Sequence, residues 1–171
     1  SPSFKNEDDI ILYVGSPRIG LGGTEYLKLI HGLTTGDAPL LDLDVEFKVQ
    51  QVVLQAITSG LVTAAHDVSD GGLAVCIAEM GIFSLLGAQI DLSIFSGSVH
   101  EIWFSEAQSG IVLTCQPNQK QTLIKHLVQG GVEVVQIGTV QGDALMFEGV
   151  GSVSLDHLHS IYESAIPEVM S

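Results

Sequence analysis

The sequence is poor in positive charge. Only 6 of its 171 residues are Lys or Arg, whereas 20 are Asp or Glu, so the formal net charge is −14. Nucleic-acid backbones and anionic membrane surfaces repel such a chain, which argues against both as partners. A phosphate ligand would therefore need backbone N–H groups, a metal ion, or cations supplied by another domain.

Cysteines and long apolar runs are also scarce. Cys76 and Cys115 are far apart in apolar contexts, which predicts free buried thiols in a reducing cytoplasm rather than a disulfide. No apolar run approaches the roughly 20 residues that a membrane helix needs. The polar start SPSFKNEDD does not resemble a signal peptide. Because the first residue is Ser, we expect a piece of a longer protein, with flexible ends at 1–8 and 167–171.

Apolar residues make up 46% of the sequence, which is enough to build the core of a single domain over 1–171. Predicted strands alternate with predicted helices, which indicates a mixed α and β fold on a mixed sheet. The turn Gln141-Gly142-Asp143 predicts a hairpin between the strands on either side of it. The predicted strands are 9–15, 61–65, 86–92, 110–115, 132–140, 144–147 and 149–153, and the predicted helices are 24–30, 44–59, 71–80, 100–104, 117–129 and 155–165.

The clearest helix is the one over 44–59. Its apolar residues recur at helical spacing and predict one buried stripe. Asp44 is the expected N-cap, and Gly60 is expected to stop the helix. The stripe consists of Val45, Val49, Val52, Val53, Ala56 and Ile57.

The stretch Leu61–Met80 has the pattern of a buried strand, a glycine-bearing loop over 66–71, and a buried helix. The start of a helix has unpaired N–H groups and the positive end of the helix dipole, so this layout favours an anion site. Ser69 or Asp70 can cap the helix, and Gly71-Gly72 would let a phosphate approach the backbone. Asp67 could hold Mg²⁺. The alternative is that Asp70 is only an N-cap and the glycines only a tight turn.

These residues also carry a family resemblance. HDVSDGGLAVCIAEM at 66–80 resembles the second-half motif of the synthetase subunit of phosphoribosylformylglycinamidine synthase. LGGTEY at 21–26, FSEAQSGIVLT at 104–114 and IGTV at 137–140 resemble further segments of that family in the same order. The resemblance implies an α+β fold, namely a three-layer α/β/α C-terminal domain of the aminoimidazole ribonucleotide synthetase type with a mixed, partly ferredoxin-like sheet. It also implies the second of two tandem copies.

The resemblance implies an ATP-dependent carbon–nitrogen ligase that converts formylglycinamide ribonucleotide to formylglycinamidine ribonucleotide in cytoplasmic purine biosynthesis. Its implied ligands are ATP or ADP, Mg²⁺ and the ribonucleotide. Its implied partners are the N-terminal ATP-binding half of the same synthetase and a glutaminase subunit or domain. We expect the isolated domain to be inactive and to expose an apolar surface or form a homodimer. The alternatives are a non-catalytic nucleotide-binding or docking module, or the equivalent domain of aminoimidazole ribonucleotide synthetase, thiamine-phosphate kinase or selenophosphate synthetase.

Carried over to single residues, the resemblance makes Asp67 a Mg²⁺ ligand and Ser69 a phosphate contact of an auxiliary nucleotide site. In short-form enzymes this site can be degenerate, which would leave both residues with structural roles. Glu106 and Gln108 lie in a segment that resembles a substrate-binding loop. Here Ser105 replaces the family's glycine and the arginine after the loop is missing, so a solvated turn is the alternative role for Glu106. No catalytic residue is expected within this chain.

Overall fold

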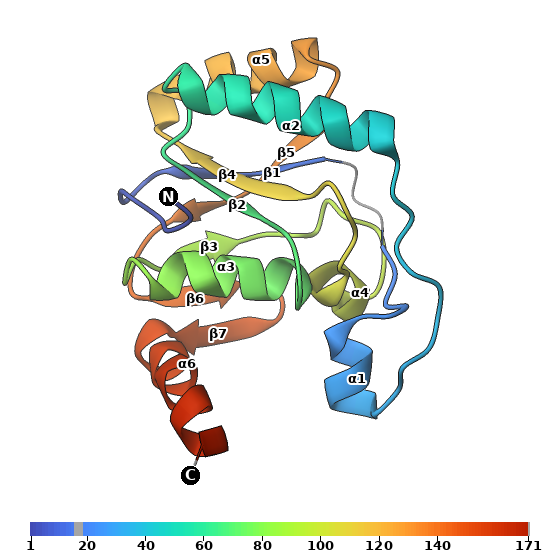
Figure 1. Ribbon diagram of the computed structural model, residues 1–171. Coiled ribbons are helices and arrows are strands. Elements are labelled where there is room, and N and C mark those ends of the chain that lie inside the picture. The colour runs from blue at the N-terminus through green and yellow to red at the C-terminus, as the bar shows by residue number, and fades with distance from the viewer. Residues whose placement is uncertain (16–18, 171) are drawn as a thin grey trace.

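The structure is a computed structural model that describes residues 1–15 and 19–170, except for the side chains of 166–170. In this part of the chain a seven-stranded mixed sheet lies between two layers of helices (Figure 1). The strands are β1 Ile10–Val14, β2 Ala64–Asp67, β3 Ala88–Ile90, β4 Ile111–Cys115, β5 Val134–Val140, β6 Ala144–Phe147 and β7 Gly151–Ser154. The helices are α1 Glu25–His31, α2 Leu43–Thr58, α3 Gly72–Ile82, α4 Val99–Phe104, α5 Lys120–Gln129 and α6 Leu155–Met170, with a 3-10 turn at Pro117–Gln119.

The strand order is β2-β4-β1-β5-β3-β6-β7. The predicted hairpin between β5 and β6 is wrong, because β3 lies between them, antiparallel to β5 and parallel to β6. The loop after β5 instead wraps around the start of β3, where the Gly87 N–H donates to Gly142 O (2.7 Å) and the Gln141 N–H donates to Gly87 O (2.9 Å). β6 forms its hairpin with β7. The expectations of an α+β fold and a mixed sheet are confirmed.

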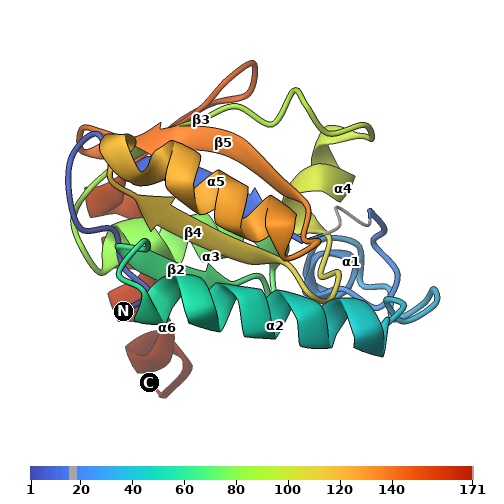
Figure 2. The same cartoon turned by 90° about the horizontal axis from the view of Figure 1, so that it is seen from above.

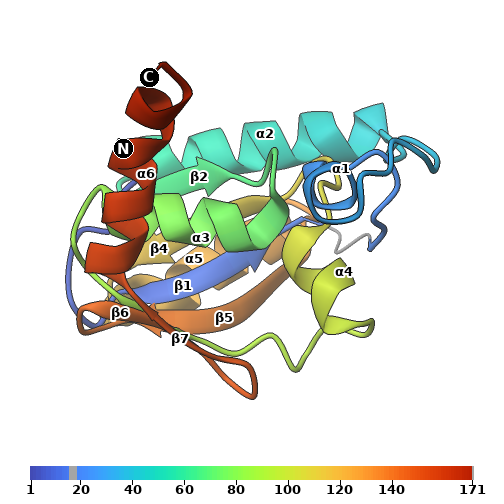
Figure 3. The ribbon, with the colours of Figure 1, turned by 90° about the horizontal axis from the view of Figure 1, so that it is seen from below.

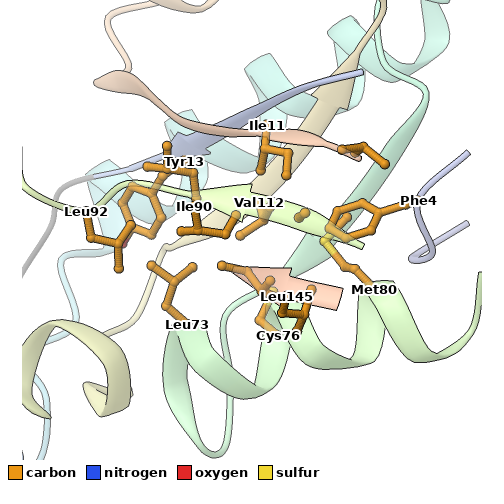
Figure 4. Packing of buried hydrophobic residues seen from close by; sticks show 14 of the residues in the cluster. Phe4, Ile11, Tyr13, Leu73, Cys76, Met80, Ile90, Leu92, Val112 and Leu145 are labelled. Carbon is orange, nitrogen blue, oxygen red and sulfur yellow. The ribbon is translucent and has the colours of Figure 1, made fainter. Parts of the chain in front are cut away.

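The helices divide between the two faces of the sheet, which confirms the three-layer arrangement. α2 and α5 lie side by side over one face (Figure 2) and enclose one apolar cluster with β1 and β4. α3 lies along the other face with α6 beside it (Figure 3). There the larger cluster packs side chains of α3 against those of β1, β3, β4 and β6, among them Met80, Ile90 and Leu145 (Figure 4). No helix in residues 1–15 and 19–170 combines the length and apolar character needed to cross a bilayer.

The long helix α2 starts one residue earlier than its apolar pattern predicts. Its N-cap is Asp42, whose carboxylate accepts from the N–H groups of Asp44 and Val45, so the prediction of Asp44 as the cap is wrong. Most of the predicted stripe faces the core, but Ile57 is 43% exposed. In the last turn of α2 only Ala56 of the predicted stripe is buried.

Residues 1–8 and 167–171 are the predicted flexible ends of the chain. Phe4, within the segment 1–8, is buried in the larger cluster, and its N–H donates to Met80 O (3.1 Å). α6 continues beyond its predicted end at Ala165 to Met170. Residue 171 lies outside the described residues, as do residues 16–18 of the predicted loop over 16–23.

The two cysteines lie in different apolar clusters on opposite faces of the sheet, and both are free. Burial raises the pKa of the Cys115 thiol to about 11, and burial likewise raises the pKa of Cys76. Only the thiolate attacks a disulfide reagent. We therefore expect both thiols in the folded chain at pH 8 to react at least ~100-fold more slowly with DTNB than in the guanidinium-unfolded chain. Rapid labelling of either cysteine in the folded protein would contradict this burial.

Candidate functional site

The predicted site begins at the end of the edge strand β2. The predicted strand 61–65 is shifted, because pairing with β4 extends through His66 and Asp67, opposite Val112 and Ile111. Asp67 is thus the last residue of the strand, and its side chain is 78% exposed. The strand delivers this carboxylate to the same end of the sheet at which α3 begins.

The loop between β2 and α3 turns through two glycines in the left-handed region, Gly71 at φ 81° and Gly72 at φ 70°. The Gly72 N–H closes the turn by donating to Ser69 O (3.0 Å). Gly71 is the N-cap residue, and no side chain caps the helix. The prediction that Ser69 or Asp70 caps α3 is therefore wrong, and both side chains are exposed instead.

Gly72 is buried against the end of α4. A Cβ at this position would lie 2.8 Å from backbone atoms of Trp103, Phe104 and Ser105. The sequence predicted that the glycines would let a phosphate approach the backbone. In the structure, the space next to Gly72 is filled by the protein's own backbone at the end of α4.

Glu106 lies where the chain leaves α4 and approaches β4. One of its carboxylate oxygens, Oε1, accepts from the Gly71 N–H (2.8 Å) and from the Glu25 N–H in the first turn of α1 (2.9 Å). The side chain is half-buried. Glu106 is therefore not in a solvated turn, and the Gly71 N–H predicted to face a phosphate already donates to this carboxylate.

Most of the predicted site residues line one cleft of about 440 Å³. The fold thus brings the loop after β2 together with the loop before β4. The predicted site residues Gly71 and Gly72 are not among the residues that line the cleft. The lining also includes residues that the sequence did not indicate, above all Glu46 and Gln50 of α2, whose position depends on the tertiary fold. The lining residues are Pro39, Glu46, Gln50, Asp67, Val68, Ser69, Asp70, Glu106, Gln108, Ser109, Gly110 and Ile111.

The carboxylates around the cleft are not equivalent. Glu46 accepts from the Ser109 hydroxyl and from the Gln50 amide, and Glu106 accepts from two backbone N–H groups. Asp67 and Asp70 are exposed. Across residues 1–15 and 19–170 there is no group of three or more His, Cys, Asp or Glu side chains placed to hold a metal ion. The residues still fit Mg²⁺, which commonly binds through one or two carboxylates and completes its shell with phosphate oxygens and water.

His66 precedes Asp67 in β2, and both of its ring nitrogens contact other groups of the protein. Its Nδ1 donates to Asp67 O (2.8 Å), and its Nε2 lies 3.2 Å from the Glu79 carboxylate of α3. The imidazole thus connects the end of β2 to the middle of α3. These two contacts give His66 a structural role next to Asp67.

Comparison with curated proteins identifies PurL subunits of several bacteria as relatives of this chain. The chain is 39% identical over 178 residues to phosphoribosylformylglycinamidine synthase subunit PurL of Symbiobacterium thermophilum, a match that covers 99% of the chain and 23% of that protein. The chain thus spans about a quarter of the length of the curated relatives it matches.

Solved structures share the fold. Thermotoga maritima PurL complexed with FGAR superposes with a TM-score of 0.77 at 19% identity, over 92% of this chain and 29% of that one. The same protein complexed with ATP gives a TM-score of 0.71 at 18% identity, over 92% of this chain and 26% of that one. The hydrogenase maturation protein HypE of E. coli gives 0.63 at 17% identity, over 90% of this chain and 50% of that one.

The family described as AIR synthase related protein, C-terminal domain, matches residues 6–148. This match spans most of the chain, including all of the strand–loop–helix segment and both loops that line the cleft. The chain therefore belongs to the family of AIR synthase related C-terminal domains.

Proposed function

We propose that this domain is the C-terminal half of the second tandem copy in a phosphoribosylformylglycinamidine synthase. In this proposal the whole protein is the ATP-dependent ligase that converts formylglycinamide ribonucleotide to formylglycinamidine ribonucleotide in cytoplasmic purine biosynthesis. The observation that carries the proposal is the placement of Asp67 and Ser69, from the motif that resembles this family, at the open cleft. The PurL relatives support it.

In the proposed site Asp67 holds Mg²⁺ and Ser69 donates its hydroxyl to a phosphate of bound ATP or ADP. Asp67 is exposed at the end of a strand that is paired with β4, so its backbone is fixed while its carboxylate reaches the cleft. Ser69 and Asp70 follow at the start of α3, where the helix dipole favours an anion. When bound, Mg²⁺ neutralises phosphate charge, which this acidic surface cannot do by itself.

Among the described residues, the lining of the cleft includes carboxylates but no Lys or Arg, which leaves it incomplete as a phosphate site. We propose that the missing cations come from the N-terminal ATP-binding half of the same synthetase, and that a glutaminase subunit or domain supplies ammonia. Gln108 is exposed in the lining, where it could meet the ribonucleotide.

A group of exposed apolar side chains supports a covering partner. They belong to α1, the segment after it and the start of α2, and they are 49–78% exposed. Exposed apolar patches of this kind commonly mark interaction sites. In our proposal the N-terminal half covers this group, and in the isolated domain a second copy would do so. The group consists of Leu29, Ile30, Leu33, Leu40, Leu41, Leu43 and Phe47.

The substitution Asp67→Asn tests the proposed metal ligand. Because it removes the charge that holds Mg²⁺, we expect the affinity for Mg²⁺–ADP to fall by about tenfold or more. The melting temperature should hardly change, because an exposed carboxylate contributes little to stability. Isothermal titration calorimetry and thermal melts of the longer synthetase that contains this domain would measure both quantities.

A matched control is Glu148→Gln, which removes one exposed negative charge at the opposite edge of the sheet. It should leave nucleotide affinity unchanged. If Asp67→Asn binds Mg²⁺–ADP as tightly as the parent protein, Asp67 is not a metal ligand. Unchanged affinity together with a lower melting temperature would give Asp67 a structural role in the loop.

A further inference from the structure

The loop 105–110 is hydrogen-bonded to three other parts of the molecule, namely the segment 20–42, α2 and the start of α3. The Ser105 hydroxyl accepts from the Gly20 N–H (3.3 Å), and the Ser109 hydroxyl donates to Glu46 of α2. Glu106 contacts both α1 and the start of α3. Ser109 adopts φ 68°, a left-handed conformation that is unfavourable for a non-glycine residue. The loop is thus held in a strained shape by contacts to its surroundings.

One of the connected parts is the segment 20–42, which we call the strap. It closes on itself where Gly22 and Gly36 meet backbone to backbone, and where the Gly23 N–H donates to Thr35 O (3.0 Å). α1 lies within the strap at the end of the molecule that also holds α4 (Figure 3), and none of its residues is buried. α1 itself therefore contributes no buried side chain to the core of the domain.

α1 contacts the rest of the domain through the Tyr26 side chain and through the Glu25 backbone. The Tyr26 ring stacks on Phe104 at 4.7 Å between centroids, and the Tyr26 hydroxyl meets Nδ1 of His100 (3.1 Å). A further contact is the hydrogen bond from the Glu25 N–H to Glu106. Stacking allows sliding along the ring plane, whereas a charge-assisted hydrogen bond fixes the position of its donor.

The Glu106 oxygen is shared between two helix starts. The Glu25 N–H and the Gly71 N–H belong to the first turns of α1 and α3, where the helices themselves provide no acceptor. The negative carboxylate also lies at the positive end of the α3 dipole. If the carboxylate were removed, both donors would lose their partner at the same time, so the two elements are linked through one atom.

We propose that Glu106 is a positioning residue that locks the strap to the start of α3 and thereby sets the shape of the cleft beside Ser69 and Asp70. Its carboxylate occupies the place at the Gly71 N–H where an anionic ligand would otherwise bind. A phosphate entering the cleft is directed away from Gly71, toward the exposed side chains of the loop. This lock is a property of the domain alone and does not depend on the proposed ligase activity.

The test compares Glu106→Ala with Glu106→Gln in the 171-residue chain by amide hydrogen exchange and NMR, without nucleotide. In the alanine variant we expect the Glu25 and Gly71 amides to exchange about tenfold faster or more. The amides of the rest of the strap should lose protection with them. The glutamine variant keeps a carbonyl acceptor at the same place and should restore protection of both amides.

Gln108→Ala is the matched control, because Gln108 lies in the same loop and is exposed. It should leave the Glu25 and Gly71 amides unchanged. The proposal is overturned if Glu106→Ala affects only one of the two amides, if the strap stays protected, or if Glu106→Gln fails to restore both. If the alanine variant does not fold, the glutamine variant decides the question: retained protection supports the lock and lost protection overturns it.

Discussion

Replacing Gly72 with alanine is expected to lower the free energy of unfolding by about 3 kcal/mol or more. Gly72 has φ 70°, where an L residue is strained, and an added Cβ would lie 2.8 Å from three backbone atoms at the end of α4. Backbone atoms cannot move aside as a flexible side chain can. The start of α3 would have to shift away from α4, and the loop carrying Ser69 and Asp70 would move with it.

Gly142→Ala is the control for this substitution, because Gly142 also has φ 70° but no atom within 4 Å of an added Cβ. Its cost should be only that of the left-handed backbone, about 1–2 kcal/mol. Urea denaturation of both variants beside the parent chain gives the difference that belongs to the contact with α4. Equal losses in the two variants would show that the space at Gly72 does not matter.

Much of the fold follows from local patterns in the sequence. The apolar stripe of α2 and the strand–loop–helix segment over 61–80 depend on spacing and on glycine, and both are present in the structure near their predicted bounds. The start of α2 differs because two acceptors, Asp42 and Asp44, compete for the N-cap. Local pattern shows that a helix begins there, but the choice between neighbouring caps depends on backbone geometry.

The strand order could not be read from the same patterns. A turn such as Gln141-Gly142-Asp143 is compatible with a hairpin, but it is also compatible with a crossing over another strand. β3 enters the sheet from more than 40 residues earlier in the chain and separates β5 from β6. Pairing between distant strands is set by packing of the whole sheet, which no local signal reports.

The candidate site shows the same division. Asp67, Ser69 and Asp70 are identified by their motif, and the structure places them together at the cleft. The hydrogen-bond partners of Glu106 could not be predicted, because the two N–H donors belong to residues 81 and 35 positions earlier in the chain. Sequence pattern can identify a carboxylate of interest, but it cannot tell whether that carboxylate faces a ligand or the protein's own backbone.

We expect the 171-residue chain alone to form no formylglycinamidine ribonucleotide from formylglycinamide ribonucleotide, ATP and ammonia. In residues 1–15 and 19–170 the cleft lining carries carboxylates without Lys or Arg, and the chain has a formal net charge of −14, so anionic substrates are repelled. Without neighbouring cations the domain cannot stabilise the charge that develops during phosphoryl transfer. The expected rate is therefore that of the protein-free blank.

The measurement compares product formation by the chain, by a blank, and by the longer synthetase in which we propose that this domain lies. Supplying ammonia directly removes the need for a glutaminase, so in our proposal the missing component is the half that provides the cations. Turnover by the longer protein and none by the chain agrees with a domain that contributes one wall of the site. Product that depends on the chain alone, and that Asp67→Asn abolishes, would instead place a complete catalytic centre within these 171 residues.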